Sequence, residues 1–470
     1  MNITYVDLPW RGKKYAARSG VRWAHTSDKT PVVSFRAFPF YMATSAAVLE
    51  KEGHKVTILD ALAHNLSEKE FFYRLGMSKP DFVVAEISTP SYSNDMSLLK
   101  DIKQKLGCKV VAVGQHTSAL PEEVSKNTFI DHVIVGEYDF TLRDLVSGKT
   151  QEKIIRLKEL PDINSIPWPA RHLFDLSKYN EAFCDNYPNV QFMASRGCPF
   201  RCSYCNIFLM FGGRNYRFRD PQDIIDEMKF AMKKYKPKEL YFDDDMINGN
   251  PKMLQELARL KIEQLPDVPW SAMGHTAITR ETLELLKKSG LVAMKFGVES
   301  VSPLVLRLLK KGTTIEVINR TLKACKELGI RTHCTYTIGL PGETIESARD
   351  TVKFAIKHGD SYQISLTIPF PGTPLYEEAL KEGWLKARNW DDYDGICDAI
   401  LEYPGLDNKG LTEIYEIGQS STYRKALSSG QYKKYVRMIY QESGVKGLAK
   451  LFFIRGPGMV KSVIRSKIKI

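Results

Sequence analysis

Short apolar runs alternate with helix-length segments along the first 150 residues. Runs of four to six apolar residues bounded by Gly, Asp or Pro are typical of strands buried on both faces of a parallel sheet. The alternation predicts a doubly wound, Rossmann-like α/β domain over residues 1–150, with any ligand at the carboxyl ends of its strands. The expected strands are 3–8, 56–60, 82–87, 110–113 and 132–135, with helices that include 42–51 and 98–106.

A second alternation begins after a Pro-containing linker, which we expect over residues 151–185. Parallel strands joined by helices predict a full or partial (β/α) barrel over residues 186–390, whose site lies at the C-terminal strand ends. The expected strands are 191–194, 239–242, 293–297, 332–337 and 363–367, and the expected helices are 222–234, 282–289, 315–328 and 345–357. Residues 391–470 then read as a small helical C-terminal region.

Composition limits the class of protein. The chain has 470 residues, of which 43% are hydrophobic and 26% are charged, as in a globular protein with more than one core. It contains no apolar run long enough to span a bilayer and begins MNITYVDLPW, without the pattern of a secretory signal, so we expect a cytoplasmic location. The net charge of +12 is spread along the chain without a nucleic-acid-binding motif, so no nucleic-acid partner is expected.

Three of the eight cysteines fall within eight positions, in the segment SRGCPFRCSYCN at 195–206. Cys198, Cys202 and Cys205 follow a predicted strand, so their thiolates lie on one strand-end loop. Thiolates are the usual ligands of iron–sulfur clusters, and three local cysteines leave one iron open for another ligand. A structural zinc site is the alternative, but it needs four ligands and no partner pair with suitable spacing is present.

The CxxxCxxC spacing, with Tyr204 before the third cysteine, resembles the signature of the radical S-adenosylmethionine (SAM) superfamily. The resemblance implies a [4Fe–4S] cluster whose open iron binds SAM and whose electron cleaves SAM to a 5′-deoxyadenosyl radical. Acids and glycines at later strand ends resemble further superfamily elements and could contact SAM. The expected SAM contacts are Tyr204, Asp243, Asp244, Asp245, Glu299, Ile338 and Gly339. Taken singly, the aspartates could be a helix N-cap and 339–342 a turn.

A doubly wound domain placed before such a barrel resembles the cobalamin-binding radical SAM enzymes. The resemblance implies that loops after the third, fourth and fifth strands of the first domain contact cobalamin. The expected contacts are Ser88, Thr89, Gly114, His116, Gly136, Glu137 and Tyr138. The Asp-x-His-x-x-Gly motif that supplies a cobalt ligand in many cobalamin proteins is absent, so the lower face of cobalt is not assigned to His116, His54 or His64. The alternative is a domain that holds substrate or nothing; no Gly-x-Gly-x-x-Gly motif supports a dinucleotide.

The resemblance implies a cobalamin-dependent enzyme, most simply a C-methyltransferase that acts on an unactivated carbon of a small molecule. A radical cyclase or oxidative rearrangement enzyme, or a corrinoid or iron–sulfur sensor without turnover, are the alternatives. Basic and apolar residues interleave over 445–470, which favours contact with an anionic membrane surface and a hydrophobic or lipid-like substrate; a helix packed on the barrel explains them equally well. A flavodoxin or ferredoxin is the expected electron donor.

Overall fold

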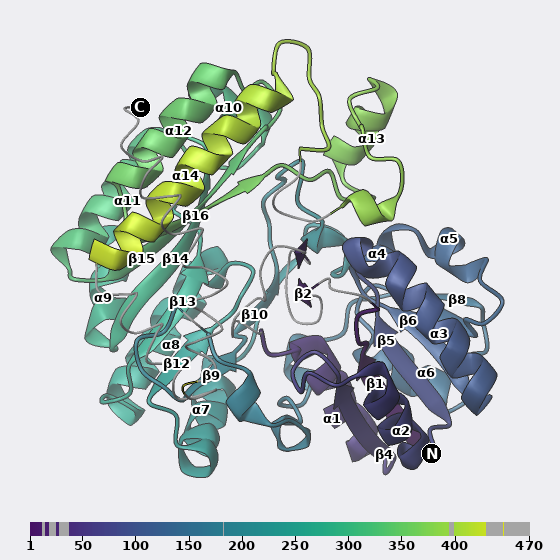
Figure 1. Ribbon diagram of the computed structural model, residues 1–470. Coiled ribbons are helices and arrows are strands. Elements are labelled where there is room, and N and C mark those ends of the chain that lie inside the picture. Colours follow the sequence, from purple (N-terminus) through teal and green to yellow (C-terminus); the bar gives the residue numbers. More distant parts are fainter. Residues whose placement is uncertain are drawn as a thin grey trace.

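The computed structural model describes residues 1–11, 15–17, 25–27, 37–181, 183–393, 399–428 and 445. These residues form two α/β lobes, one from each half of the chain (Figure 1). Each lobe is built on a six-stranded parallel sheet, so the expected fold class and domain order are confirmed.

The N-terminal lobe is a doubly wound sheet with strand order β4-β1-β5-β6-β7-β8. Helices α1 and α6 pack on one face of the sheet, whereas α2, α3 and α5 pack on the other. Because β1 leads into α1 and β5 leads into α3, the chain changes face between these neighbouring strands, which is where such sheets open a ligand crevice. The strands are β1 (Asn2–Asp7), β4 (Lys55–Asp60), β5 (Phe82–Glu86), β6 (Lys109–Val113), β7 (His132–Val135) and β8 (Ile154–Arg156). The helices are α1 (Phe40–Lys51), α2 (Glu68–Ser78), α3 (Tyr92–Leu106), α4 (Gln115–Ala119), α5 (Pro121–Ser125) and α6 (Asp139–Val146). A hairpin of β2 (Tyr15–Ala17) and β3 (His25–Ser27) lies between the lobes in Figure 1.

The boundary expected at residue 150 is wrong, because β8 pairs with β7 and completes the first sheet. A three-residue edge strand is too short to show an alternation of polar and apolar positions. The linker therefore begins after Arg156, and it is fixed to both lobes: Ala170 N donates to Ala43 O over 3.0 Å, and Arg171 forms an ion pair with Glu227 over 2.5 Å.

The second lobe is a partial barrel with strand order β9-β12-β13-β14-β15-β16. All of its neighbouring strands are parallel, and among the described residues no pair joins β16 to β9. Its strands are β9 (Asn189–Phe192), β12 (Glu239–Phe242), β13 (Trp270–Gly274), β14 (Leu291–Glu299), β15 (Arg331–Ile338) and β16 (Ser361–Leu366). Its helices are α7 (Pro221–Tyr235), α8 (Pro251–Gln264), α9 (Arg280–Lys288), α10 (Pro303–Leu308), α11 (Ile315–Glu327), α12 (Ile345–Lys357), α13 (Pro374–Lys381) and α14 (Asn408–Ser428). The sequence patterns did not reveal β13 or α8.

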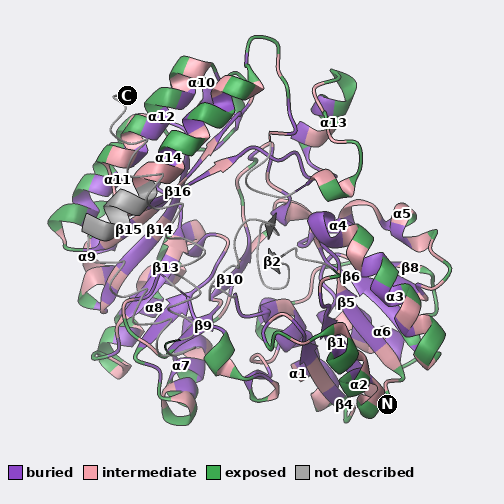
Figure 2. Ribbon diagram, viewed as in Figure 1, coloured by how far each residue is buried: buried purple, intermediate pink, exposed green. Residues whose placement is uncertain are grey.

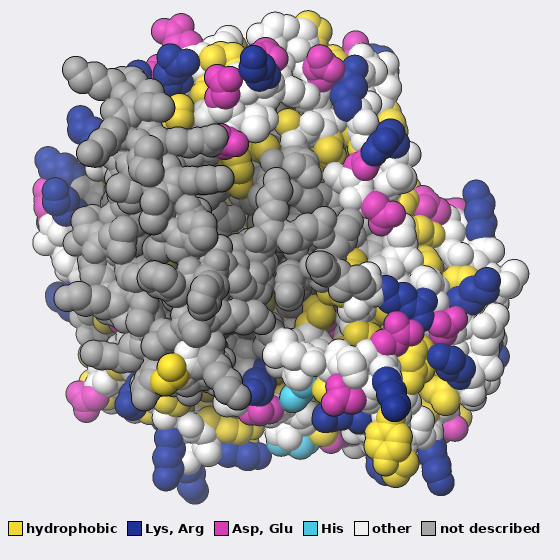
Figure 3. Space-filling model, in the orientation of Figure 1, with side chains coloured by type: hydrophobic (Ala, Val, Ile, Leu, Met, Phe, Trp, Pro, Cys, Tyr) yellow, Lys and Arg dark blue, Asp and Glu magenta, His cyan; other side chains and the backbone are white. Residues whose placement is uncertain are grey.

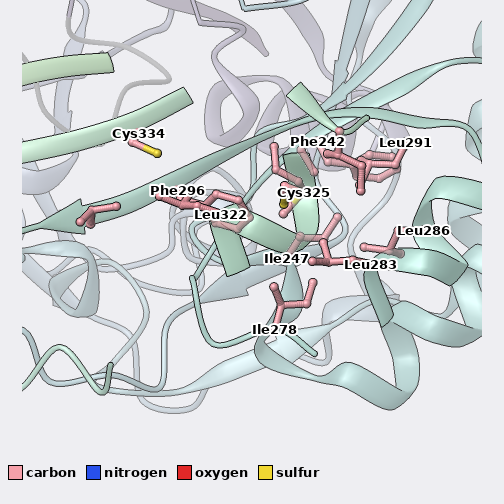
Figure 4. Close-up of a cluster of buried hydrophobic side chains, with 14 of the residues drawn as sticks. Phe242, Ile247, Ile278, Leu283, Leu286, Leu291, Phe296, Leu322, Cys325 and Cys334 are labelled. Carbon is pink, nitrogen blue, oxygen red and sulfur yellow. The ribbon is translucent and has the colours of Figure 1, made fainter. Parts of the chain in front are cut away.

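The two faces of this sheet differ in chemistry. Outward side chains such as Phe242 and Phe296 belong to one continuous hydrophobic core with Leu286 and Leu322 of the covering helices (Figure 4). Figure 2 shows the strands of this sheet as largely buried. Helix α14 extends this core over β16 and α12. Since side chains alternate along a strand, the polar residues between the core positions of β15 and β16 face the inside of the barrel.

Two further expectations concern the surface and the C-terminus. Among the described residues, no helix is long and apolar enough to cross a membrane. Basic and acidic side chains are interspersed over the described part of the face in Figure 3. The segment 445–470, on which the membrane expectation rests, lies outside the described residues except for Val445, which is 70% exposed.

Candidate active site

The cysteine loop leaves and re-enters the second lobe through a small hairpin. β10 (Ser195–Gly197) pairs antiparallel with β11 (Tyr216–Phe218), and the loop between them spans residues 198–215. Gly197 adopts a φ of 85°, and a Cβ at this position would collide with the carbonyl of Asn215, so only glycine fits where the loop closes. The hairpin thus sets the three cysteines at the carboxyl end of the sheet.

The three thiols lie close enough to interact electrostatically with one another. Cys202 is buried, Cys198 and Cys205 are partly exposed, and none forms a disulfide. Burial raises the pKa of the Cys198 thiol to about 11 and raises the pKa of Cys202 and Cys205, so the metal-free loop holds neutral thiols. No three His, Cys, Asp or Glu side chains in the described chain converge on a single metal ion.

The predicted aspartates after β12 support the base of the cysteine loop. Asp244 is fully buried and accepts hydrogen bonds from the Ser195 hydroxyl and the Ala194 amide, and Asp245 accepts one from the Gly197 amide over 3.2 Å. The helix-cap explanation is wrong, because Asn250 caps α8. Asp243 is buried, and its negative charge adds to the effect of burial in raising the pKa of Glu181.

Glu299 lies in a strained position beside the loop. It has a φ of 70° at an irregularity in β14, and its carboxylate accepts hydrogen bonds from Lys311 Nζ over 2.9 Å and from the Thr337 hydroxyl over 2.8 Å. Burial lowers the pKa of Lys311, but the Glu299 carboxylate outweighs this effect, so the net pKa is raised. Tyr204 is buried and also interacts with Glu299.

Lys311 was not predicted from the sequence. It follows α10 in the triplet Lys310–Gly312, where the missing Cβ of Gly312 leaves room for the ring of Phe200 from the cysteine loop. Phe200 stacks on His275 with ring centroids 4.2 Å apart. A glycine directly after paired lysines was the only sequence signal for this contact.

Gly339 and Ile338 lie at the end of β15. Gly339 has a φ of 82°, and its amide donates to Glu343 Oε2 over 2.6 Å, so the residues form a turn closed by Glu343. Burial raises the pKa of Glu343 to about 7. The side chain of Ile338 lies in the hydrophobic core and its carbonyl accepts from Thr367, so a contact between this residue and SAM stays a prediction.

In the N-terminal lobe, the loops after β5 and β6 meet at the expected crevice. The Thr89 hydroxyl lies 3.1 Å from His116 Nδ1, and the Ser88 hydroxyl lies 2.7 Å from that of Ser91. Gly114 adopts a φ of 103°, and a Cβ there would lie 3.1 Å from Ile87 N. The glycine therefore allows the two loops to approach each other.

His116 is fully buried, and its Nε2 atom has no hydrogen-bond partner among the described residues. Its ring lies between Tyr92 and Trp390, with centroid distances of 4.6 and 5.2 Å. Burial lowers the pKa of His116 to about 3, so the imidazole is neutral. Trp390, which donates to Glu123 over 2.7 Å, reaches this lobe from beyond the barrel, and no sequence pattern indicated this long-range contact.

The loop after β7 contacts residues of both lobes. Gly136 N donates to Ser118 over 3.0 Å, and the Tyr138 hydroxyl donates to Glu86 over 2.7 Å. Both carboxylate oxygens of Glu137 form ion pairs with residues of the second lobe, Arg196 and Arg217. Contacts between this loop and the corrinoid stay a prediction.

Two family models match this chain, one in each lobe. Residues 32–146 match the B12 binding domain and residues 193–355 match the radical SAM superfamily. The chain is a radical SAM enzyme with a B12-binding domain. The expected cofactors, a [4Fe–4S] cluster, SAM and cobalamin, are confirmed at the level of these domain families.

Proteins similar to this chain carry methyltransferase or cyclase names. The chain is 28% identical to an uncharacterized methyltransferase of Pyrococcus horikoshii, over 90% of this chain and 95% of that protein. It is 26% identical to the cytidylyl-2-hydroxyethylphosphonate methyltransferase of Streptomyces wedmorensis, over 80% and 84% of the two chains, and 26% identical to the anaerobic magnesium-protoporphyrin IX monomethyl ester cyclase of Rubrivivax gelatinosus, over 72% and 66%.

Solved structures share the fold. The methyltransferase TsrM from Kitasatospora setae, with cobalamin and a [4Fe–4S] cluster bound, superposes with a TM-score of 0.62 at 17% identity, over 81% of this chain and 74% of that one. The cobalamin-dependent radical enzyme OxsB superposes with a TM-score of 0.66 at 15% identity, over 97% and 75%.

The described residues fit these cofactors. Three free cysteines on one loop suit the cluster. The close approach of backbone at Gly114 and the unpartnered nitrogen of His116 suit a ligand at the crevice of the B12-binding lobe. Cys198, Cys202 and Cys205 would hold the cluster, and the loops after β5 and β6 would hold the corrinoid.

Proposed function

We propose that this enzyme methylates an unactivated carbon of a small-molecule substrate. The observation that carries the proposal is the direct packing of the cysteine loop on the B12-binding lobe. Just after Cys205, Asn206 donates to Gln115 over 3.1 Å, and Ile207, Met210 and Phe211 join the hydrophobic core of that lobe. A reaction that uses both cofactors on one substrate needs their two loops to be neighbours.

When bound, the cluster and SAM supply the hydrogen-abstracting radical, and cobalamin supplies the methyl group. The chain's own part is to orient and enclose. Asp244 and Asp245 fix the base of the cysteine loop, and the buried Lys311 holds the carboxylate of Glu299 beside it. In the other lobe, the partly exposed rings of Tyr92 and Trp390 cover His116 and shield its imidazole from water.

The polar side chains inside the barrel bear on the class of substrate. A hydrophobic or lipid-like substrate was inferred from residues 445–470, nearly all of which are outside the described chain. The inward positions of β15 and β16, by contrast, include Thr335, Gln363 and Ser365, which are at least partly exposed. These side chains favour a substrate that carries polar groups near the reacting carbon. Flotation of the full chain and of a chain ending at residue 444 with anionic liposomes tests the lipid idea; equal flotation contradicts it.

The products of SAM test the proposal directly. Anaerobic, reduced protein loaded with iron and cobalamin should convert SAM to both S-adenosylhomocysteine and 5′-deoxyadenosine. Formation of S-adenosylhomocysteine should require cobalamin, whereas formation of 5′-deoxyadenosine should require the cluster. Cobalamin-loaded protein that forms 5′-deoxyadenosine alone, with every substrate tried, would rule out methyl transfer.

A cobalamin-dependent cyclase is the second candidate, because one similar protein is a cyclase. Cyclisation consumes no methyl group, so the same product measurement separates the two candidates. 5′-deoxyadenosine without S-adenosylhomocysteine favours the cyclase.

A further inference from the structure

We propose that Arg196, Glu137 and Asp139 form an interdomain clamp that positions the cysteine loop against the corrinoid crevice. Arg196 is therefore a positioning residue of this enzyme. The inference deepens the proposed function by assigning residues that set the relative placement of its two cofactors. Its test requires the cofactors to be bound but does not require the methyl-transfer proposal to be correct.

The clamp joins two short segments that lead directly to the cofactor loops. Arg196 is in β10, two residues before Cys198, and its guanidinium lies 2.7 Å from Glu137 and 2.7 Å from Asp139. Glu137 lies in the turn between β7 and α6, and Asp139 is the first residue of α6, at the strand ends of the B12-binding lobe. Two charge-assisted hydrogen bonds therefore couple the position of one loop to that of the other.

The clamp is buried, and additional hydrogen bonds and ion pairs hold its side chains in place. The side chains of Arg196, Glu137 and Asp139 are at most 5% exposed. The Thr44 hydroxyl of α1 donates to Asp139 and lies 3.0 Å from Arg196, and Arg217 of β11 forms an ion pair with the second oxygen of Glu137. Glu137 is thus held from both strands of the hairpin that carries the cysteine loop.

An ion-pair group of this kind is better explained by positioning than by stability. Buried ion pairs often add little to stability compared with apolar residues of similar volume, because both charges must be desolvated. The planar guanidinium, however, accepts only a narrow range of geometries for two carboxylates. The side of the loop after Cys205 is fixed separately, by Asn206 and the apolar contacts of residues 207–211. The cysteine loop is therefore held by the B12-binding lobe on both of its flanks.

A second group in the chain provides a matched control. Glu227 of α7 is as buried as Glu137 and is paired with two arginines, Arg171 over 2.5 Å and Arg219 over 2.6 Å. This group joins the linker to the barrel, and its ion pairs involve no residue of the B12-binding lobe; its contact with that lobe is the guanidinium of Arg171 over the ring of Phe38, 5.7 Å from the ring centroid. Glu137→Gln and Glu227→Gln therefore remove equivalent charges, but only the first one alters the clamp.

The experiment is electron paramagnetic resonance of reduced protein that contains both cob(II)alamin and the [4Fe–4S]⁺ cluster. Two neighbouring spins split or broaden each other's signals, and the splitting depends steeply on their separation and orientation. Wild type and Glu227→Gln should show the same splitting. Arg196→Lys and Glu137→Gln should show a reduced or heterogeneous splitting at unchanged iron and cobalt content. A role in stability alone would lower the melting temperature in the Glu137 and Glu227 variants without changing the splitting.

Each outcome decides the proposal. Unchanged splitting in both clamp variants, or no interaction between the spins in the wild type, would overturn it. If the clamp variants lose a cofactor, Thr44→Val provides the milder test, because it removes only one hydroxyl and keeps every charge. A Thr44→Val splitting identical to the wild type would then count against the clamp. The result does not depend on substrate turnover, so failure of the methyl-transfer proposal would be recognised separately.

Discussion

The strand ends of the two lobes differ in how their polar side chains are used. In the radical SAM lobe, acids from neighbouring strands reach across to the cysteine loop: Asp244 and Asp245 hold its base, and Glu299 pairs with Lys311 beside it. In the B12-binding lobe, the hydroxyls of Ser88 and Thr89 bind groups of the same lobe. A metal cluster needs its ligands preset, whereas a large flat cofactor can rely on the shape of a crevice.

The largest expected effect is a substitution that removes the cluster of the radical SAM lobe and leaves the B12-binding lobe unchanged. Cys202→Ala should abolish iron incorporation and all SAM cleavage, because the loop supplies three thiolates to the cluster and the variant keeps only two. Corrinoid binding should persist, since Cys202 lies outside the loops after β5 and β6 that would hold the corrinoid. Iron and cobalt analysis with 5′-deoxyadenosine measurement checks this. Cys108→Ala, in the core of the B12-binding lobe, is the control and should keep its iron; SAM cleavage by Cys202→Ala would contradict the assignment of the cluster.

Next in size is the loss of the buried partner of Glu299. Lys311→Met leaves a carboxylate buried without its counter-charge, which costs about 3–5 kcal/mol of unfolding free energy. For a lobe of this size the melting temperature should fall by roughly 10 °C. The double variant Lys311→Met/Glu299→Gln removes both charges and should recover much of the loss. A single variant as stable as the wild type would show that the pair is not needed to hold this strand end.

A smaller effect is expected from pH, again in the radical SAM lobe. The pKa of Glu343 is raised from 4.5 to about 7 by burial, so the folded protein favours the protonated acid. Protonation of Glu343 therefore contributes fully to the free energy of unfolding below pH 4.5, and this contribution is lost as the pH rises through 7. The loss amounts to roughly 3 kcal/mol, at about 1.4 kcal/mol per pKa unit. Glu343→Gln cannot ionise and should lose less stability between pH 5 and 8 than the wild type. Parallel denaturant titrations check this, and identical pH profiles would contradict it.

The smallest effect should come from the B12-binding lobe. Thr89→Val removes one hydrogen bond to His116, worth about 1 kcal/mol, so corrinoid affinity should change by less than about tenfold. Thr117→Val, which removes a neighbouring buried hydroxyl bonded to Val113 O, is the control. Titration of apoprotein with cobalamin measures both. A loss of binding in the Thr89 variant alone would mean that this crevice is as tightly preset as the cysteine loop.

The sequence predicted the fold more completely than the site. Strands with apolar runs, such as His132–Val135 and Glu239–Phe242, were predicted at their observed bounds, because burial on both faces leaves a local signal. The edge strand β8 was missed because three residues carry no period. The cysteines were found because their ligand spacing is local, but Arg196, Lys311 and Trp390 were not, since their partners lie far away in the chain.

Glu137 shows a further limit. Its place after a strand of the B12-binding lobe made it a candidate contact for cobalamin, which stays a prediction. Its ion pairs with Arg196 and Arg217 could not be predicted from residue type, because both arginines belong to the second lobe and lie far away in the chain.

Trp390 has a consequence for dividing this enzyme into parts. It lies beyond the barrel strands, yet its ring covers His116 and its indole N–H binds Glu123 of the first lobe. A fragment cut at the apparent domain boundary would uncover a buried imidazole and the apolar surface around it. Swapping the B12-binding lobe between relatives would likewise separate partners that fold against each other. The lobes are modular in sequence but interdependent as folded units, and a chimera must carry the segment around Trp390 together with the lobe that it covers.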